Sequence, residues 1–167
     1  MILLDTILRE AINPALAMLP VNMDTPDARV MLLAIGLQES RFMYRYQKLV
    51  GQPYRKGPAL GYWQFEKGGG VQGVLNHPSS MLHARDICAS RNVLPTADDV
   101  WPELETDDIL AAAFARLLLW TDRAPMPKTT ASHDEAWNCY YRCWRPGLPK
   151  RDTWDEFHAQ AVGQVVA

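Results

Sequence analysis

The chain has 167 residues, 48% of them hydrophobic and 22% charged, values that exclude a disordered protein and are typical of a globular one. This is the size of one domain, so we expect residues 1–167 to form a single domain. The net charge of −2 predicts no nucleic-acid partner and no attraction to an anionic membrane.

The N-terminal segment predicts a helix over residues 2–19, because its apolar side chains recur at helical spacing and Pro20 follows. Asp5, Arg9 and Glu10 interrupt the apolar run, so no signal peptide is expected. No stretch of the chain approaches the roughly 20 apolar residues that span a bilayer, so membrane insertion is not expected either.

A second helix is predicted to start at Pro26, with Thr25 as its N-cap, and to continue to about Arg45. Residues 47–73 follow and contain seven glycines. This composition predicts an irregular segment with room for a short hairpin.

The second half of the chain shows further helix starts and no series of strands. Ser79 or Ser80 begins a helix to about Asn92, and Thr106 begins a strongly apolar helix to about Asp122. Two capping boxes predict the last helices, over about 133–144 and 154–165; they are Ser132 with Glu135 and Thr153 with Glu156. The expected fold is therefore all-α, with about six to eight helices and one irregular insertion.

The three cysteines are Cys88, Cys139 and Cys143, an odd number that cannot be fully paired. Cys139 and Cys143 are four residues apart, a marginal spacing for a disulfide within a helix, so a packing role is expected. No Cys/His cluster has zinc-binding spacing. The sequence predicts a reduced protein with no metal and no cofactor.

Glu39 lies near the end of the predicted second helix, in the stretch "LAIGLQESRF". Leu32, Ile35 and Gly36 would share its helix face. Burial and the negative end of the helix dipole would both raise its pKa, toward the protonated form that a general acid needs. The alternative left open by helix periodicity is a solvent-exposed Glu39 that pairs with Arg41 or Arg45.

Three short motifs occur in a fixed order: "QESRF" at 38–42, "GPALGYWQFE" at 57–66 and "EAWNCYY" at 135–141. Their order and spacing resemble the lysozyme-like lytic transglycosylase superfamily, in particular phage-encoded enzymes that degrade peptidoglycan. The resemblance spans about residues 28–145 and implies a lysozyme-like domain.

The resemblance also implies roles for individual residues. Glu39 would be the general acid and Ser40 its neighbouring partner. The third motif departs from the family pattern because Trp137 stands where a tyrosine is usual, so Tyr140 or Tyr141 would have to supply a hydroxyl near the acid. The residues expected to bind substrate are Ser40, Gly61, Tyr62, Trp63, Gln64, Trp137, Asn138, Tyr140 and Tyr141.

The implied activity is that of a lytic transglycosylase, which cleaves the β-1,4 bond between N-acetylmuramic acid and N-acetylglucosamine in peptidoglycan. A hydrolase would need a second carboxylate, and Glu66 is the candidate; its structural alternative is a surface pair with Lys67. A non-catalytic virion or wall-binding protein of the same fold is the third alternative. The expected partners are glycan strands and other virion proteins, in a phage particle or in the host cytoplasm before action on the cell wall.

Overall fold

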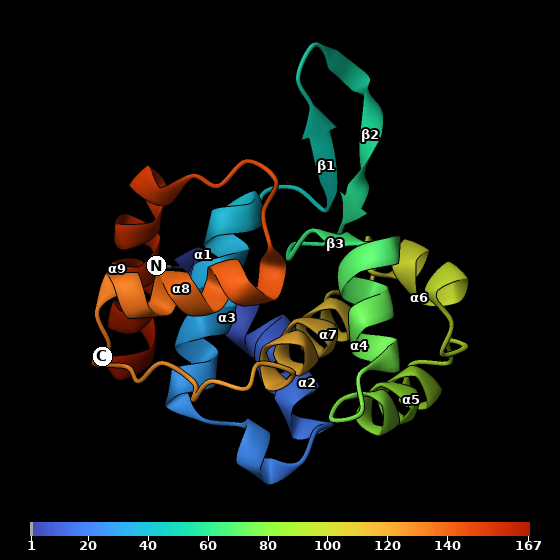
Figure 1. Ribbon diagram of the computed structural model, residues 1–167, viewed down its shortest axis with the longest axis horizontal. Coiled ribbons are helices and arrows are strands. Elements are labelled where there is room, and N and C mark those ends of the chain that lie inside the picture. The colour runs from blue at the N-terminus through green and yellow to red at the C-terminus, as the bar shows by residue number, and fades with distance from the viewer. Residues whose placement is uncertain (1) are drawn as a thin grey trace.

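The computed structural model describes residues 2–167 and shows a mainly helical body from which a β-hairpin projects (Figure 1). The prediction of an all-α fold is therefore correct only for the body. The elements in chain order are α1 (Ile2–Ile7), η1 (Leu8–Ile12), α2 (Asn13–Ala17), η2 (Val21–Met23), α3 (Pro26–Ser40), β1 (Tyr46–Leu49), β2 (Gln52–Leu60), β3 (Phe65–Glu66), η3 (Lys67–Val71), α4 (Gln72–Asn76), α5 (Met81–Ser90), α6 (Ala97–Glu103), α7 (Asp108–Trp120), α8 (His133–Trp144) and α9 (Arg151–Val166).

The predicted N-terminal helix consists of α1, η1 and α2, which follow one another without a break over residues 2–17. The middle part, η1, is π-helical. Pro14 stands in the first turn of α2, and a proline in a helix lacks an N–H and clashes with the carbonyl one turn earlier. The π-helical turn η1 lies directly before the helix that contains this proline.

Helix α3 starts as predicted, because the Thr25 side chain accepts a hydrogen bond from the N–H of Ala28 at 3.1 Å and Pro26 is the first helical residue. It ends at Ser40 rather than at about Arg45. Arg41 and Phe42 have φ values of 54° and 53°, in the left-handed region that ends helices. The prediction of a longer helix was wrong because no glycine marks this turn in the sequence. Arg41 and Phe42 adopt the left-handed conformation instead.

Residues 47–73 contain more regular structure than their glycine content predicted. Strand β2 pairs antiparallel with β1 on one side and with β3 on the other. The first five residues of β2 are exposed, and the buried residues lie in its second half, at Gly57, Ala59 and Leu60. The sequence did not reveal the full length of this hairpin, because an exposed strand does not have to alternate apolar and polar residues.

The second half is helical as expected, with changes at the starts of two helices and one additional short helix. Asp107, not Thr106, caps α7, since its carboxylate accepts the N–H of Leu110 at 2.9 Å. Helix α9 begins at Arg151, so Thr153 lies inside it and does not form the predicted capping box. The short helix α6 was not predicted, although Thr96 caps it.

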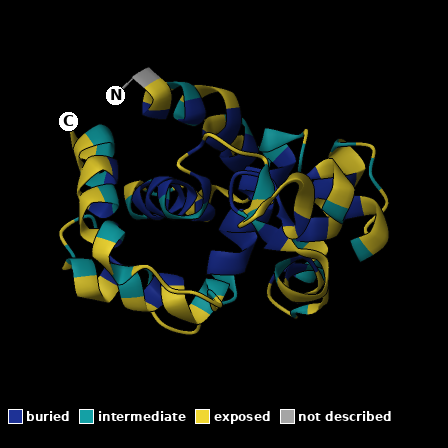
Figure 2. Cartoon of the chain, turned by 90° about the horizontal axis from the view of Figure 1, so that it is seen from above, coloured by how far each residue is buried: buried dark blue, intermediate teal, exposed yellow. Residues whose placement is uncertain are grey.

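The core is formed by two almost fully buried helices, α3 and α7. Residues 30–37 of α3 and 110–119 of α7 are buried without interruption. Helix α3 packs along α9 and also contacts α7 and α8. Figure 2 shows these buried segments in the middle of the molecule, with the exposed helix faces turned outward. Among residues 2–167, no helix combines the length and the apolar character that crossing a bilayer requires.

Candidate functional site

The end of α3 is held against the segment that follows the hairpin through Ser40. Its buried hydroxyl lies 2.7 Å from the carbonyl oxygen of Tyr62 and 3.2 Å from that of Gly36, and it accepts the N–H of Phe42 at 3.1 Å. These contacts connect the first and second motifs directly. Ser40 therefore fixes the backbone next to Glu39 and has no exposed hydroxyl to offer a ligand.

The Glu39 carboxylate receives a hydrogen bond from α8. The hydroxyl of Tyr140 donates to Glu39 Oε1 at 2.5 Å. Tyr140 is buried, whereas Tyr141 is half-exposed and packs beside Trp137. Of the two tyrosines that the sequence offered as the hydroxyl donor, Tyr140 is the one beside Glu39.

The pKa of Glu39 is raised from its ordinary value of 4.5 to about 7. Burial is the main cause, because it disfavours the charged form. The hydrogen bond from Tyr140 and the positive charge of Lys150 both stabilise the carboxylate and limit the rise. Near neutral pH, Glu39 is thus divided between its protonated and ionised forms.

The two arginines that could have neutralised a solvent-exposed Glu39 have other contacts. Arg41 lies over the ring of Phe157. Arg45 forms a two-point ion pair with Asp108, at 2.8 and 2.9 Å, and covers the ring of Tyr62. The alternative of an exposed Glu39 paired with Arg41 or Arg45 is therefore wrong.

The second motif turns sharply at Gly61, whose φ is 78°. A Cβ at this position would lie 2.6 Å from the carbonyl oxygen of Leu104, so only glycine fits. Two residues on, Trp63 is fully buried and its indole N–H donates to the Leu32 carbonyl of α3 at 2.9 Å. Trp63 supports this turn from inside, which corrects the prediction that it contacts substrate.

The other predicted binding residues differ in their exposure. Tyr62 is almost fully buried under Arg45. Gln64 is partly exposed and its side-chain amide donates to the Gly61 carbonyl at 2.9 Å. Trp137 is partly exposed and Asn138 is exposed, both on α8. Gln64, Trp137 and Asn138 are therefore accessible to a ligand.

Glu66, the candidate second carboxylate, lies exposed on β3. Its expected partner Lys67 instead forms an ion pair with Asp98 at 3.1 Å and lies near the ring of Trp101. The alternative of a Glu66–Lys67 pair is therefore wrong, although Glu66 does lie at the surface. Within the described chain, Glu66 makes no ion pair, so no neighbouring charge orients its carboxylate.

Three residues outside the motifs complete the surroundings of Glu39. Trp154 of α9 stacks on Tyr140, with ring centroids 5.1 Å apart and planes 13° from parallel. Trp144 donates to the Trp63 carbonyl at 2.9 Å, and Lys150 supplies the nearby positive charge. Sequence reasoning missed Trp154 and Lys150 because they lie outside all three motifs.

Two cavities, of about 220 and 330 Å³, lie elsewhere, and neither is lined by Glu39 or Tyr140. Within residues 2–167, one group of side chains could hold a metal ion, and it consists of Asp122, Cys139 and Cys143.

No family model matches the chain, and the comparisons found no curated protein and no solved structure with significant similarity to it. The superfamily resemblance of the three motifs therefore stays a prediction.

Proposed function

We propose that the protein cleaves the glycan strands of peptidoglycan as a lytic transglycosylase, with Glu39 as general acid and then general base. The observation that carries this proposal is the Glu39 carboxyl itself, held at the end of a buried helix with a pKa near 7 and a tyrosine hydroxyl on one oxygen. The order of the three motifs supports the choice of substrate.

The first step needs a proton on the glycosidic oxygen as the bond breaks. The Tyr140 hydroxyl donates to Oε1 of Glu39, so Oε2 is left to carry the acidic proton. A pKa of about 7 makes the group acidic enough to give up this proton and basic enough to hold it near neutral pH. Tyr140 then stabilises the carboxylate that remains.

The second step uses the carboxylate as base. It takes the proton of the C6 hydroxyl of the muramic acid sugar, and the C6 oxygen attacks C1 to close a 1,6-anhydro ring. One residue thus serves both steps, and no second carboxylate is required. The exposed Glu66, which lacks a charged partner in the described chain, supports this mechanism over an inverting hydrolase with Glu66 as base.

The substitution Glu39→Gln tests the proposal. The amide retains the size of the side chain and can still accept the Tyr140 hydrogen bond, but it has no acidic proton to transfer to the leaving oxygen. Loss of general acid catalysis costs roughly 10²–10⁴ in rate, and we expect release of dye-labelled fragments from purified peptidoglycan to fall by at least that factor.

Glu66→Gln is the matched control, because it is the same change at an exposed carboxylate. It should leave most of the release rate intact. Equal release by wild type and Glu39→Gln would refute the assignment of Glu39, and equal losses in both variants would instead support the hydrolase.

A further inference from the structure

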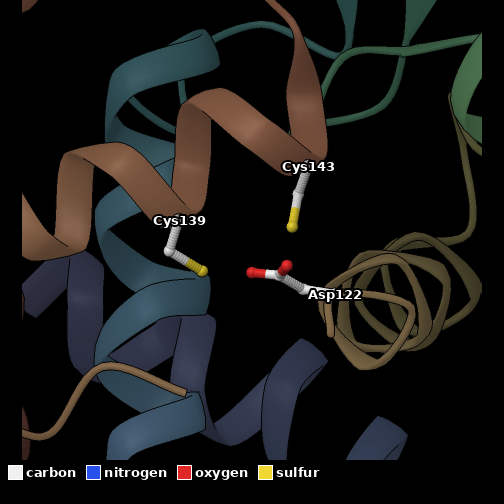
Figure 3. Close-up of side chains that lie close together, drawn as sticks. All are labelled: Asp122, Cys139 and Cys143. Atoms are coloured by element: carbon white, nitrogen blue, oxygen red, sulfur yellow. The ribbon is translucent and has the colours of Figure 1, made fainter. Parts of the chain in front are cut away.

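A second cluster of reactive side chains lies where the end of α7 meets α8. Asp122 follows the last residues of α7, and Cys139 and Cys143 lie one turn apart on α8. Each offers one ligand atom, and the three atoms lie within 4.8 Å of one another. Figure 3 shows the two sulfur atoms and the carboxylate pointing toward one another across a small gap.

The cluster is connected in the absence of an ion. Both cysteines are free, and their sulfur atoms lie within 4.8 Å of each other and of an Asp122 carboxylate oxygen. Asp122 also accepts from Arg142, at 2.9 Å to Nη2. Two thiols of α8 and the carboxylate that follows α7 converge here, which simple packing of cysteines does not require.

We propose that Asp122, Cys139 and Cys143 form a binding site for one thiophilic divalent cation of the Zn²⁺ class, with water completing a tetrahedral set. Thiolate sulfur and carboxylate oxygen are both ordinary zinc ligands. Binding converts two thiols and one Zn²⁺ into a dithiolate complex and releases two protons to solvent. The sequence analysis expected no metal. It missed this site because Asp122 is distant in sequence from the two cysteines.

The charges around the cluster suit such a complex. Two thiolates, one carboxylate and one Zn²⁺ give a net charge of −1, which the guanidinium of Arg142 balances. Arg116 adds a second buried positive charge close enough to interact with Cys139. These positive charges offset the negative charge of the dithiolate complex.

The site has an approach from solvent and a connection to Glu39. A cavity of about 330 Å³ is lined by Asp122 and Arg116, and it gives an ion a route to the carboxylate. Cys139 directly precedes Tyr140, the donor to Glu39. A bound ion would therefore fasten α8 to the end of α7 at the turn that presents Tyr140.

Titration of the reduced, metal-free protein with Co²⁺ tests the proposal without any use of activity. We expect a saturable thiolate-to-cobalt absorption band with one equivalent bound, which Zn²⁺ then abolishes. Cys143→Ser should reduce the band by about half. Since loss of an outer-shell partner typically costs roughly 10–100-fold in affinity, loss of this direct ligand should cost at least tenfold.

Two further variants separate this site from adventitious binding. Asp122→Asn should keep the band, because both thiolates remain, but weaken the affinity. Cys88→Ala is the matched control, since Cys88 is a buried free cysteine on α5 outside the cluster, and it should bind like the wild type.

The proposal is overturned if the wild type shows no saturable band, or if Cys143→Ser binds like the wild type. Cys143 and Asp122 are only partly buried, and circular dichroism would confirm that their variants are folded. These outcomes are independent of the proposed function, because an inactive protein would bind the ion equally well.

Discussion

At the scale of single residues, Glu39 is subject to opposing effects. Burial raises its pKa, while the Tyr140 hydroxyl and the charge of Lys150 lower it, and the result is a pKa of about 7. Burial, followed by the charge and hydrogen bond of Glu39, raises the pKa of the Tyr140 hydroxyl well above its ordinary value, so Tyr140 stays a hydrogen-bond donor while Glu39 titrates. The pair consists of one titrating acid and one fixed donor.

This balance predicts how Tyr140→Phe changes the titration of Glu39. The substitution removes a hydrogen bond that favours the carboxylate, so the pKa of Glu39 should rise above its wild-type value of about 7. An NMR titration of the side-chain carboxyl carbon measures both values. Tyr141→Phe removes a hydroxyl from a half-exposed neighbour and should leave the pKa unchanged. A Glu39 pKa near 4.5 in the wild type would contradict the description of the site.

At the scale of elements, the end of α3 depends on Gly36. The Phe42 ring folds back onto it, and a Cβ at Gly36 would lie 2.1 Å from the ring atom Cζ. This contact turns the chain after Ser40 and fixes the last helical turn, which carries Glu39. Gly36 is therefore required because the Phe42 ring packs against it. Its backbone is helical, so no unusual φ calls for a glycine at this position.

Gly36→Ala should consequently destabilise the protein. Overpacking of a core typically costs about 1–3 kcal/mol, measured here as the free energy of unfolding in urea. Gly163→Ala is the matched control, because Gly163 lies in α9 with open space around its Cα. There the same change should stabilise by roughly 0.4–1 kcal/mol. Equal effects at the two positions would show that the Phe42 contact does not constrain α3.

Element positions were largely predictable where local signals act alone. Thr25 with Pro26 and Ser132 with Glu135 marked real helix starts, because a capping hydrogen bond involves only neighbouring residues. The end of α3 and the start of α9 were misplaced, since contacts distant in sequence decide them. Thr153, read as part of a cap, instead donates to the Gln38 side chain of α3 at 3.1 Å.

At the scale of the whole molecule, the site is assembled from four separate parts of the chain. Helix α3 contributes Glu39, the turn at Gly61 supports it, α8 brings Tyr140, and α9 places Trp154 against Tyr140. Sequence reasoning singled out Glu39 because the three-motif resemblance favoured it as the acid, whereas helix periodicity alone left an exposed Glu39 open. It could not choose between Tyr140 and Tyr141, because that choice depends on how α8 packs.

The raised pKa of Glu39 also predicts a pH dependence of global stability. In the unfolded chain the group ionises near its ordinary 4.5, but in the folded protein only near 7. Below pH 4.5 both states are protonated and stability is unaffected. As the pH rises to about 7, the folded state is progressively disfavoured, by about 1.4 kcal/mol per pH unit and roughly 3 kcal/mol in all.

Glu39→Gln removes this ionisation and should be more stable than the wild type at neutral pH. The difference in unfolding free energy should vanish below about pH 4 and level off above about pH 8. Urea denaturation of both proteins across this range measures it. A difference that does not change with pH would mean that Glu39 ionises equally well in the folded and unfolded states.

The most direct test of the central claim is the chemistry of the products released from purified peptidoglycan. If Glu39 acts alone as acid and then base, mass spectrometry of the fragments released by the wild type should find 1,6-anhydromuramic acid ends. These fragments are lighter by one water than the corresponding hydrolysis products. Reducing ends, or the absence of any released fragments, would contradict the account.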